Sequence, residues 1–314
     1  MSPAVATRVV LAVDLGGTTM KGVVVDETGR EVADLERPTP TAGVVEALGD
    51  LLGELGSVAR GQGLTPVGAA VVSPGSVDEG QGVVRYASNL GWRDVPLRDL
   101  LEPAVGLPIA VAHDVRTAGL AEWRFGAARG SDDVVLVPIG TGVAAAVVSA
   151  GGLVTGATGT AGEFGHIPVV PDGEPCACGQ RGCLEVYASG AGVARRYAAR
   201  TGSVATAREV VARLGSDPDA DEVWAEAVTV LARGLAILTL LLDPSVIVLG
   251  GGFSHAGEAL LVPLGAELRD GLAWRAPPEV AVSRLGDRAG RVGAAVLAFE
   301  AAGLGDLVTA WPTS

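Results

Sequence analysis

The sequence predicts an α/β protein with a duplicated core, organised as two domains with a cleft between them. The prediction rests on one pattern that occurs twice. The first copy covers Arg8–Val25, where two β-branched runs flank the glycine turn Asp14–Thr19. The second covers Asp133–Val148, where two apolar runs flank Gly140–Gly142. Two strand–turn–strand units in one chain indicate related halves, each presenting its glycine turn to the cleft.

The elements of the first half follow from hydrophobic periodicity. Apolar residues recur at helical spacing over Val44–Leu55, and the continuous apolar run Val67–Val72 predicts a buried strand that ends at Ser73-Pro74-Gly75. A second apolar run, Pro108–Ala112, predicts a strand at the boundary between the halves. A helix from Val115 to Gly126 is expected to begin the second half.

The second half continues with a long helical pattern over Glu222–Leu242 and a buried strand over Ser245–Leu249. The strand opens onto Gly250-Gly251-Gly252, and an apolar helix, Arg291–Ala302, closes the chain. We therefore expect a small α/β domain over residues 1–112, completed by residues 291–314. A larger α/β domain is expected over residues 113–290.

Composition and charge exclude several classes of protein. Hydrophobic residues make up 48% of the 314 residues and charged residues 19%, which is too apolar for a disordered chain. A net charge of −13 disfavours general affinity for nucleic acid or for anionic membranes. Every stretch of 18 residues contains Gly, Pro or a charged residue, so no transmembrane helix is expected. The N-terminus has no signal-peptide pattern, and a cytoplasmic protein is therefore expected.

Three cysteines lie within one short segment, at positions 176, 178 and 183, shortly after Gly162-Glu163-Phe164-Gly165-His166. Three thiolates and one imidazole form the Cys₃His set of a closed structural zinc site. The sequence therefore predicts zinc bound by His166, Cys176, Cys178 and Cys183. With four protein ligands the ion would shape a loop rather than activate water.

The glycine turns have the composition of phosphate-binding turns. In the first, Gly16 and Gly17 permit close approach of phosphate to backbone N–H groups, and Thr18 and Thr19 add hydroxyl donors. Asp14 at the strand end can hold Mg²⁺ directly or through water. The second turn, Gly140-Thr141-Gly142, has a similar composition. A third, Gly250–Gly252, follows a buried strand but lacks the spacing of a dinucleotide fingerprint.

His113 and Asp114 stand between a predicted strand and a predicted helix. An aspartate in this place is most often a helix N-cap. A catalytic carboxylate that emerges into a cleft can also occupy such a position. The sequence by itself leaves both interpretations open.

Together these motifs resemble the ROK family of repressors and sugar kinases, and within it the bacterial glucokinases. The matching segments run in family order from about residue 8 to residue 300 and are Asp14–Thr19, Ser73–Gly75, Asn89–Trp92, His113-Asp114, Gly140–Gly142, Ala161–His166, Cys176–Cys183 with Glu185, and Gly250–Gly252. The resemblance implies an actin-like fold of the hexokinase and Hsp70 class. It also implies transfer of phosphate from ATP, with Mg²⁺, to the 6-hydroxyl of a hexose, with glucose the first candidate.

The resemblance also assigns roles. Asp114 is implied to be the general base for the sugar hydroxyl. Sugar contacts are implied for Gly75, Asn89, His113, Asp114, Glu163, His166 and Glu185. Contacts with ATP and Mg²⁺ are implied for Asp14, Gly16, Gly17, Thr18, Thr19, Gly140, Thr141, Gly142, Gly251 and Gly252. His166 would thus both bind zinc and face the sugar. The family also implies a homodimer or homotetramer.

One departure from the family pattern affects the choice of sugar. The family usually has Asn immediately before the catalytic Asp, whereas this chain has His113. A histidine has a chosen tautomer and a larger volume than an amide. A kinase for an amino sugar or an N-acetylhexosamine is therefore the alternative.

Two further alternatives belong to other classes of protein. A ROK repressor would need a DNA-binding segment, yet only about eight residues precede the first predicted strand. A silent sugar sensor would lack Asp114 or the phosphate turn, and both are present.

Overall fold

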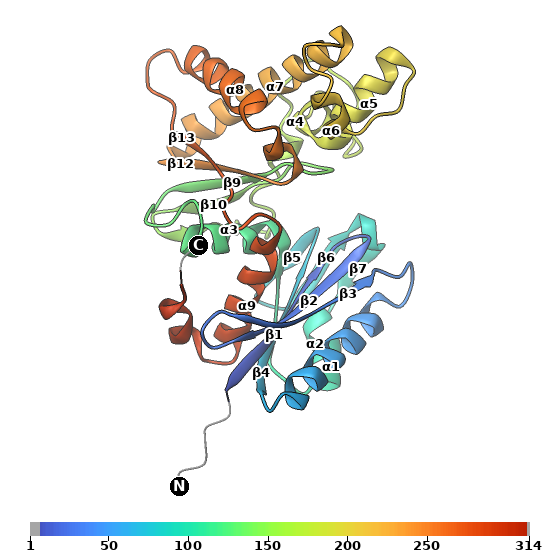
Figure 1. Cartoon of the computed structure of the whole chain (residues 1–314), viewed down its shortest axis with the longest axis vertical. Helices are drawn as coiled ribbons and strands as arrows, with labels where there is room; N and C mark the ends of the chain where they lie inside the picture. The colour runs from blue at the N-terminus through green and yellow to red at the C-terminus, as the bar shows by residue number, and fades with distance from the viewer. Residues whose placement is uncertain (1–6, 313–314) are drawn as a thin grey trace. The chain divides into compact units, whose positions relative to one another are not determined.

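The computed structural model describes residues 7–312 and divides into two compact units (Figure 1). The first unit contains the described chain up to Ala121, the loop Thr155–Thr160 and the chain from Asp287. The second contains Glu122–Val154 and Ala161–Gly286. The first unit thus extends past the expected boundary at residue 112 and takes in a loop from the middle of the chain.

A five-stranded sheet in the order β3-β2-β1-β4-β8 forms the core of the first unit. Its strands are β1 Arg8–Leu15, β2 Thr19–Asp26, β3 Glu31–Pro38, β4 Thr65–Ser73 and β8 Ile109–His113. The first three strands pair antiparallel, whereas β4 and β8 run parallel to β1. Asp14 and His113 lie at the carboxyl ends of two parallel strands, where ligand-binding residues of α/β sheets gather.

The second unit has a sheet of the same design, in the order β11-β10-β9-β12-β13. Its strands are β9 Val134–Pro138, β10 Ala146–Ser149, β11 Gly152–Leu153, β12 Val246–Gly250 and β13 Glu279–Val282. Again the first three strands pair antiparallel and the last two run parallel to the first. The predicted duplication is therefore confirmed.

Helices cover both faces of the first sheet. They are α1 Val44–Gly61, α2 Leu97–Val105 and α9 Ala289–Ala301. Helix α3, Asp114–Phe125, follows β8 directly, and its last turn belongs to the second unit. Leucines of α1 pack with Val9, Leu11 and Val13 in one hydrophobic cluster, while α9 packs against β1, β4 and β8 (Figure 1). Because both faces of β1 are covered, its sequence is a continuous apolar run rather than an alternation.

A small antiparallel sheet joins the first unit, with β5 Ser76–Asp78, β6 Val83–Ala87 and β7 Trp92–Val95. The sequence reasoning missed it, because its strands are short. The short helix η1, Ser88–Leu90, connects β6 to β7 and includes Asn89. This sheet follows β4 directly through Gly75, whose φ of 93° and close approach to the carbonyl of Tyr86 require glycine.

Five helices build most of the second unit: α4 Leu184–Ala188, α5 Gly190–Thr201, α6 Ala207–Val211, α7 Pro218–Leu242 and α8 Glu258–Gly271. Helix α7 is long and apolar enough to cross a membrane by length and composition. Its buried residues, among them Trp224, Leu231 and Leu235, lie in the hydrophobic core of this unit. We therefore interpret α7 as a core helix.

Candidate active site

The first glycine turn, between β1 and β2, is closed by one backbone hydrogen bond and one from a threonine side chain. The N–H of Gly16 donates to the carbonyl of Thr19 at 2.9 Å, and the Thr39 hydroxyl donates to the carbonyl of Gly16 at 2.7 Å. A side chain at Gly17 would lie 3.0 Å from the amide nitrogen of Asn89. The fold thus places one expected sugar ligand beside one expected phosphate-binding residue.

Asp14, at the end of β1, is a carboxylate in a desolvated position. Burial raises the pKa of Asp14 above its ordinary value, and the positive charges of Lys21 and Arg291 oppose this shift. A buried carboxylate of this kind gains from a nearby cation. The donor chemistry fits Mg²⁺, which prefers oxygen ligands.

His113 and Asp114 occupy the junction between β8 and α3. Nδ1 of His113 accepts a hydrogen bond from the backbone N–H of Arg116 at 3.3 Å, which is the contact an N-cap side chain makes. Asp114 is the first residue of α3, and its Oδ1 accepts from the N–H of Val115 at 2.7 Å. The sequence left open whether Asp114 is the N-cap of this helix, and in the structure His113 makes the capping contact.

The protonation state of His113 follows from this geometry. Since Nδ1 accepts the N–H of Arg116, a neutral ring carries its proton on Nε2. Burial, and then the charge of Arg116, lowers the pKa of His113 to about 3, so the ring is neutral near pH 7. In His113 the acceptor Nδ1 is therefore already bonded, and Nε2–H is the donor that is left. An asparagine at this position would present an amide group instead.

We expect His113→Asn to retain the fold and to change the ranking of sugars. Asn is also a good N-cap, so α3 keeps its capping contact. The polar group offered beyond the cap changes in position and size, which is worth about 1–3 kcal/mol, or about 5- to 150-fold in kcat/KM. Steady-state kinetics with glucose, mannose and amino sugars measure the change. An unaltered ranking would show that His113 does not contact the sugar.

The same variant has an expected effect on stability against pH. The folded-state pKa of His113 lies below its unfolded value, so unfolded chains take up a proton between about pH 6.5 and pH 3. The free energy of unfolding should therefore fall as pH decreases through this window. In His113→Asn this part of the decrease should be absent from urea unfolding curves.

The second glycine turn lies against Glu185, two residues after Cys183. Oε2 of Glu185 accepts the backbone N–H of Val143 at 3.0 Å. A side chain at Gly142 would lie 2.5 Å from that same oxygen, so a larger residue there would have to displace the Glu185 carboxylate. A carboxylate expected at the sugar is thus fixed by the turn expected at the phosphates.

A cavity of about 630 Å³ opens beside this turn in the second unit. Its lining is mostly apolar or small and comprises Gly140, Thr141, Gly190, Ala191, Ala194, Thr206, Ala207, Arg208, Val211, Trp224, Gly252, Phe253, His255 and Ala256. Among the expected nucleotide contacts, Gly140, Thr141 and Gly252 line it. Gly251 instead packs over the carbonyl of Ile139 with φ 71°.

The residues of α5, α6 and α7 that line this cavity were missed by the sequence reasoning. The start of α5, Gly190-Ala191-Gly192, is a run of small residues after a capping serine, and this signal was available. The alanines and Trp224 carry no signal that separates them from core residues.

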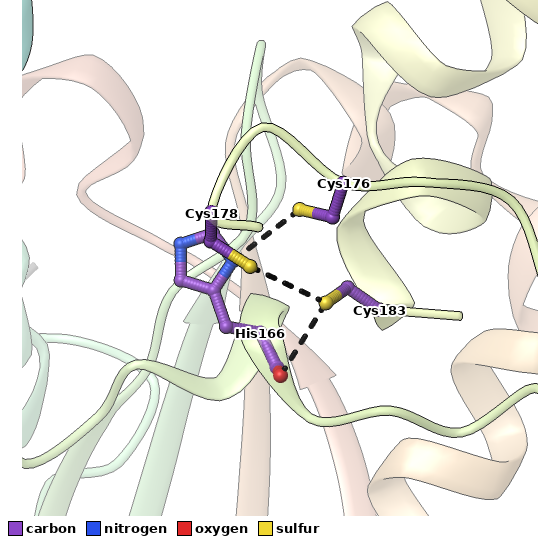
Figure 2. Close-up of side chains that lie close together, drawn as sticks. All are labelled: His166, Cys176, Cys178 and Cys183. Atoms are coloured by element: carbon purple, nitrogen blue, oxygen red, sulfur yellow. Dashed lines mark hydrogen bonds between the residues drawn. The ribbon is translucent and has the colours of Figure 1, made fainter. Parts of the chain in front are cut away.

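The predicted metal ligands lie together (Figure 2). The ligand atoms of His166, Cys176, Cys178 and Cys183 are all within 4.8 Å of one another. Sγ of Cys176 is 3.7 Å from Nδ1 of His166, and the sulfurs of Cys178 and Cys183 are also 3.7 Å apart. Three sulfurs and one nitrogen at this spacing fit the donor set of a tetrahedral zinc ion.

His166 has two environments. Nδ1 faces Cys176, whereas Nε2 lies 3.9 Å from Oε2 of Glu163. Both residues belong to the segment around the short helix η2, Phe164–His166. Within the second unit, the His166 side chain therefore connects the loop of residues 174–183, here called the cysteine loop, to a residue expected at the sugar.

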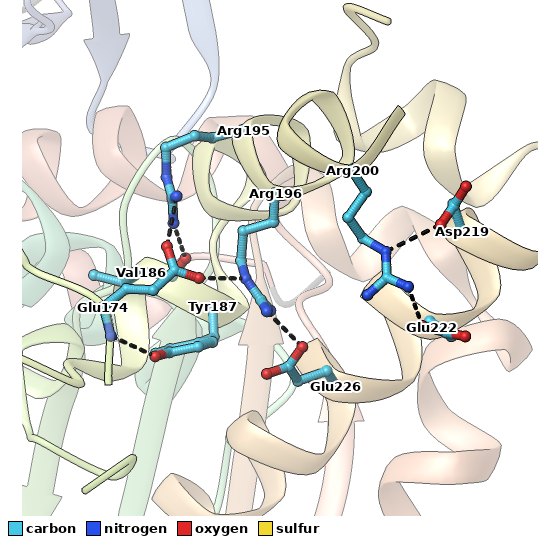
Figure 3. A network of polar contacts seen from close by, with 9 residues as sticks. All are labelled: Glu174, Val186, Tyr187, Arg195, Arg196, Arg200, Asp219, Glu222 and Glu226. Atoms are coloured by element: carbon cyan, nitrogen blue, oxygen red, sulfur yellow. Dashed lines mark hydrogen bonds and ion pairs between the residues drawn. The ribbon is translucent and has the colours of Figure 1, made fainter. Parts of the chain in front are cut away.

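The cysteine loop is attached to the helices of the second unit through Glu174 (Figure 3). Its carboxylate pairs with Arg195 at 2.6 Å and Arg196 at 2.8 Å, and its N–H donates to the Tyr187 hydroxyl at 2.8 Å. Arg196 continues to Glu226 on α7 at 2.5 Å. Burial raises the pKa of Glu174, but the two arginines together lower it by more. The pKa of Glu174 is therefore below its ordinary value.

The expected site residues divide between the two units. Gly75, Asn89, His113, Asp114 and the first glycine turn belong to the first unit. Glu163, His166, Glu185, the second glycine turn, Gly250–Gly252 and the cysteines belong to the second.

Two sheets of identical order, each with a glycine turn after its central strand, define the actin-like class of two-domain folds. Within this class, the sequence profile of the ROK family matches residues 10–301. The chain therefore belongs to the ROK family.

Individual relatives agree with the family. A glucokinase of Streptomyces coelicolor is 36% identical over 313 residues, covering 92% of this chain and 97% of the relative. An N-acetylmannosamine kinase of Citrobacter koseri is 36% identical over 297 residues, covering 92% and 98%. Among solved structures, a ROK glucokinase from Streptomyces griseus in complex with glucose and AMPPNP has a TM-score of 0.80 at 36% identity, covering 93% and 99%.

Proposed function

We propose that this chain is an ATP-dependent hexokinase that phosphorylates glucose at the 6-hydroxyl. The observation that carries the proposal is the apolar cavity of the second unit, with Gly140 and Thr141 at its border. An apolar cavity suits a nucleobase, and a glycine turn beside it suits the phosphates. The similarity to a glucokinase structure with glucose and AMPPNP supports the same assignment.

The proposed reaction divides the work between the two glycine turns and Asp114. Phosphoryl transfer needs positioning and charge stabilisation more than covalent chemistry from the protein. Backbone N–H groups of the turns would hold the phosphate oxygens, and Asp114 would accept the proton of the attacking 6-hydroxyl. Mg²⁺, with Asp14 as its proposed protein contact, would neutralise phosphate charge when bound.

The proposed sugar contacts use complementary hydrogen-bonding groups. Asn89 supplies an amide, Glu163 and Glu185 supply carboxylates, and His166 supplies Nε2. A buried hydroxyl partner left unmatched costs about 1–3 kcal/mol, so such a set selects among sugars.

We further propose that the Cys₃His cluster binds a structural zinc ion. The four donors fit zinc in type and in spacing. The ion would fix His166 through Nδ1 and leave Nε2 for the sugar. Its role would then be to shape the sugar site, since all four positions are taken by protein.

An amino-sugar or N-acetylhexosamine kinase is the second candidate. His113 in place of the usual Asn favours it. The imidazole that caps the helix offers a single N–H donor, at a position that differs from that of an Asn amide. The 36% identity to an N-acetylmannosamine kinase also supports it. A cytoplasmic role in carbohydrate metabolism, and assembly as a homodimer or homotetramer, stay predictions.

A sugar panel tests the function directly. Purified protein is assayed with ATP and Mg²⁺ on glucose, mannose, glucosamine, N-acetylglucosamine and N-acetylmannosamine, with phosphate position determined by NMR. We expect glucose to have the highest kcat/KM and the product to be the 6-phosphate. Preference for an N-acetylhexosamine would favour the second candidate, and failure on every sugar would contradict both.

The nucleotide cavity gives a separate prediction. Ala194→Trp fills the cavity and should raise the KM for ATP by about tenfold or more, a loss of about 1.4 kcal/mol. Binding of glucose alone, measured by calorimetry, should be retained. Ala199→Trp is the matched control, because Ala199 is an exposed residue of the same helix. Equal ATP kinetics for both variants would place the nucleotide elsewhere.

A further inference from the structure

Arg116 is a buried arginine in the first turn of the helix that begins at Asp114. Its side chain is only 2% exposed. Full burial of a guanidinium is rare in proteins unless the charge is paired. The proposed reaction gives this residue no contact with sugar or nucleotide, so its burial needs another account.

The partner of Arg116 is Glu79, which follows β5. Oε1 of Glu79 accepts from Nε of Arg116 at 2.9 Å and lies 2.8 Å from Nη2. The same oxygen accepts the backbone N–H of His113 at 3.2 Å. One oxygen of Glu79 therefore contacts the backbone of His113, which precedes Asp114, and the side chain of Arg116, which follows it.

Arg116 also binds a segment distant in sequence. Nη1 donates to the carbonyl of Gly159 at 2.8 Å. Gly159 belongs to Thr155–Thr160, the loop that packs with the first unit although the chain on either side belongs to the second. Glu163, a proposed sugar ligand, follows this loop by a few residues.

The third contact closes the arrangement around Asp114. Nδ1 of His113 caps the helix by accepting the backbone N–H of Arg116, and that nitrogen lies 3.5 Å from Oδ1 of Asp114. Asp114 thus stands between two residues that are each fixed by hydrogen bonds to a common partner, Glu79.

Energetics favour a positioning role over a stabilising one. A buried ion pair recovers little more than the cost of desolvating its two charges, and apolar residues of similar volume often stabilise as well or better. A planar guanidinium, however, holds several acceptors in fixed directions, which lysine cannot do. Such a group determines where a backbone segment lies more than how stable it is.

We propose that Glu79 and Arg116 are positioning residues that fix the β8–α3 junction so that the Asp114 carboxylate meets the sugar hydroxyl. This inference rests on the proposed function, in which Asp114 is the general base. Misplacement of a catalytic group by about 1 Å can lower turnover about 10²-fold. The pair would act through Asp114 and not by contact with the substrates.

The test is a double-mutant cycle between Arg116→Lys and Asp114→Asn. Arg116→Lys keeps the charge but loses the geometry that joins Glu79 to Gly159. We expect kcat to fall about 10- to 10²-fold with little change in the KM for ATP. In the Asp114→Asn background the same change should have almost no further effect, because the positioned group is already absent.

Arg37→Lys is the matched control. Arg37 belongs to the same unit and donates two hydrogen bonds to the Glu54 carboxylate, and none of its described hydrogen bonds involves Glu79 or Arg116. Its replacement loses the same kind of paired contact, and kcat per folded molecule should stay close to that of the parent. Glu79→Gln is the second variant, for use if Arg116→Lys does not fold, and the same cycle is expected for it.

The outcomes separate the inference from the function on which it rests. A parent protein that phosphorylates no sugar overturns both. An active parent in which Arg116→Lys lowers kcat equally with and without Asp114 overturns the positioning role alone. A loss of kcat that Arg37→Lys reproduces would also overturn the positioning role.

Discussion

Asp114→Asn should lower kcat by about 10²–10⁴-fold, the usual contribution of a general base. Asparagine keeps the size of the side chain and a hydrogen-bonding oxygen but cannot accept the proton of the attacking hydroxyl. Sugar and ATP affinity should change little, because the proposed contacts with them are made mainly by the glycine turns and by Asn89, Glu163, His166 and Glu185. Steady-state kinetics and calorimetric binding measure the two effects separately.

The structure sharpens this prediction by identifying the cap of α3. His113 makes the capping contact, so Asp114→Asn should leave stability almost unchanged. Asp99→Asn is a matched control, since Asp99 is an exposed carboxylate in the first turn of α2. Both changes remove a negative charge near a helix N-terminus. A folded Asp114→Asn protein that retains more than about a tenth of kcat would remove Asp114 as the base.

Cys178→Ala should release the metal and reduce both stability and sugar affinity. The proposed site would lose one of four ligands, and binding of a structural zinc ion contributes directly to folding, by on the order of 10 kcal/mol in small zinc domains. The parent should contain about one zinc per chain by elemental analysis. In the variant we expect no zinc, a lower melting temperature and a raised KM for glucose.

Gln180→Ala is the control for the cysteine loop. Gln180 is exposed in the same loop, and its contacts with Cys176 and Cys178 are made by its backbone. This variant should keep zinc, stability and sugar affinity. Parent protein that is purified without chelators, folded, active and free of metal would contradict the zinc site altogether.

The fold could be predicted from the sequence because its strongest signals are local. The turns at Asp14–Thr19 and Gly140–Gly142 each interrupt a strand-forming run, and the recurrence of this order indicated the duplication before any contact was known. The cysteine loop was equally local, since the four donors lie within a short stretch of chain. Such signals survive in a single sequence because neighbours in the chain determine them.

The cavity proposed for the nucleotide and the Glu79–Arg116 pair could not be predicted in this way. Ala191 and Ala194 look like ordinary helix residues, and only the packing of α5 beside the second glycine turn makes them a cavity wall. Arg116, read along the sequence, is a charge on a helix and would be placed in solvent. Its burial depends on Glu79 and Gly159, which meet it only in the folded chain.

On the proposed zinc and sugar contacts, the two nitrogens of His166 have separate tasks, so this position would accept few other residues. Zinc sites exchange histidine and cysteine readily, since Cys₄ and Cys₃His are both common. A thiolate has one donor atom, whereas an imidazole has two nitrogens on different edges of the ring. A fourth cysteine here would therefore retain the ion and leave nothing opposite Glu163. With these proposed contacts, replacement of His166 by cysteine is expected to give a folded protein that recognises its sugar poorly.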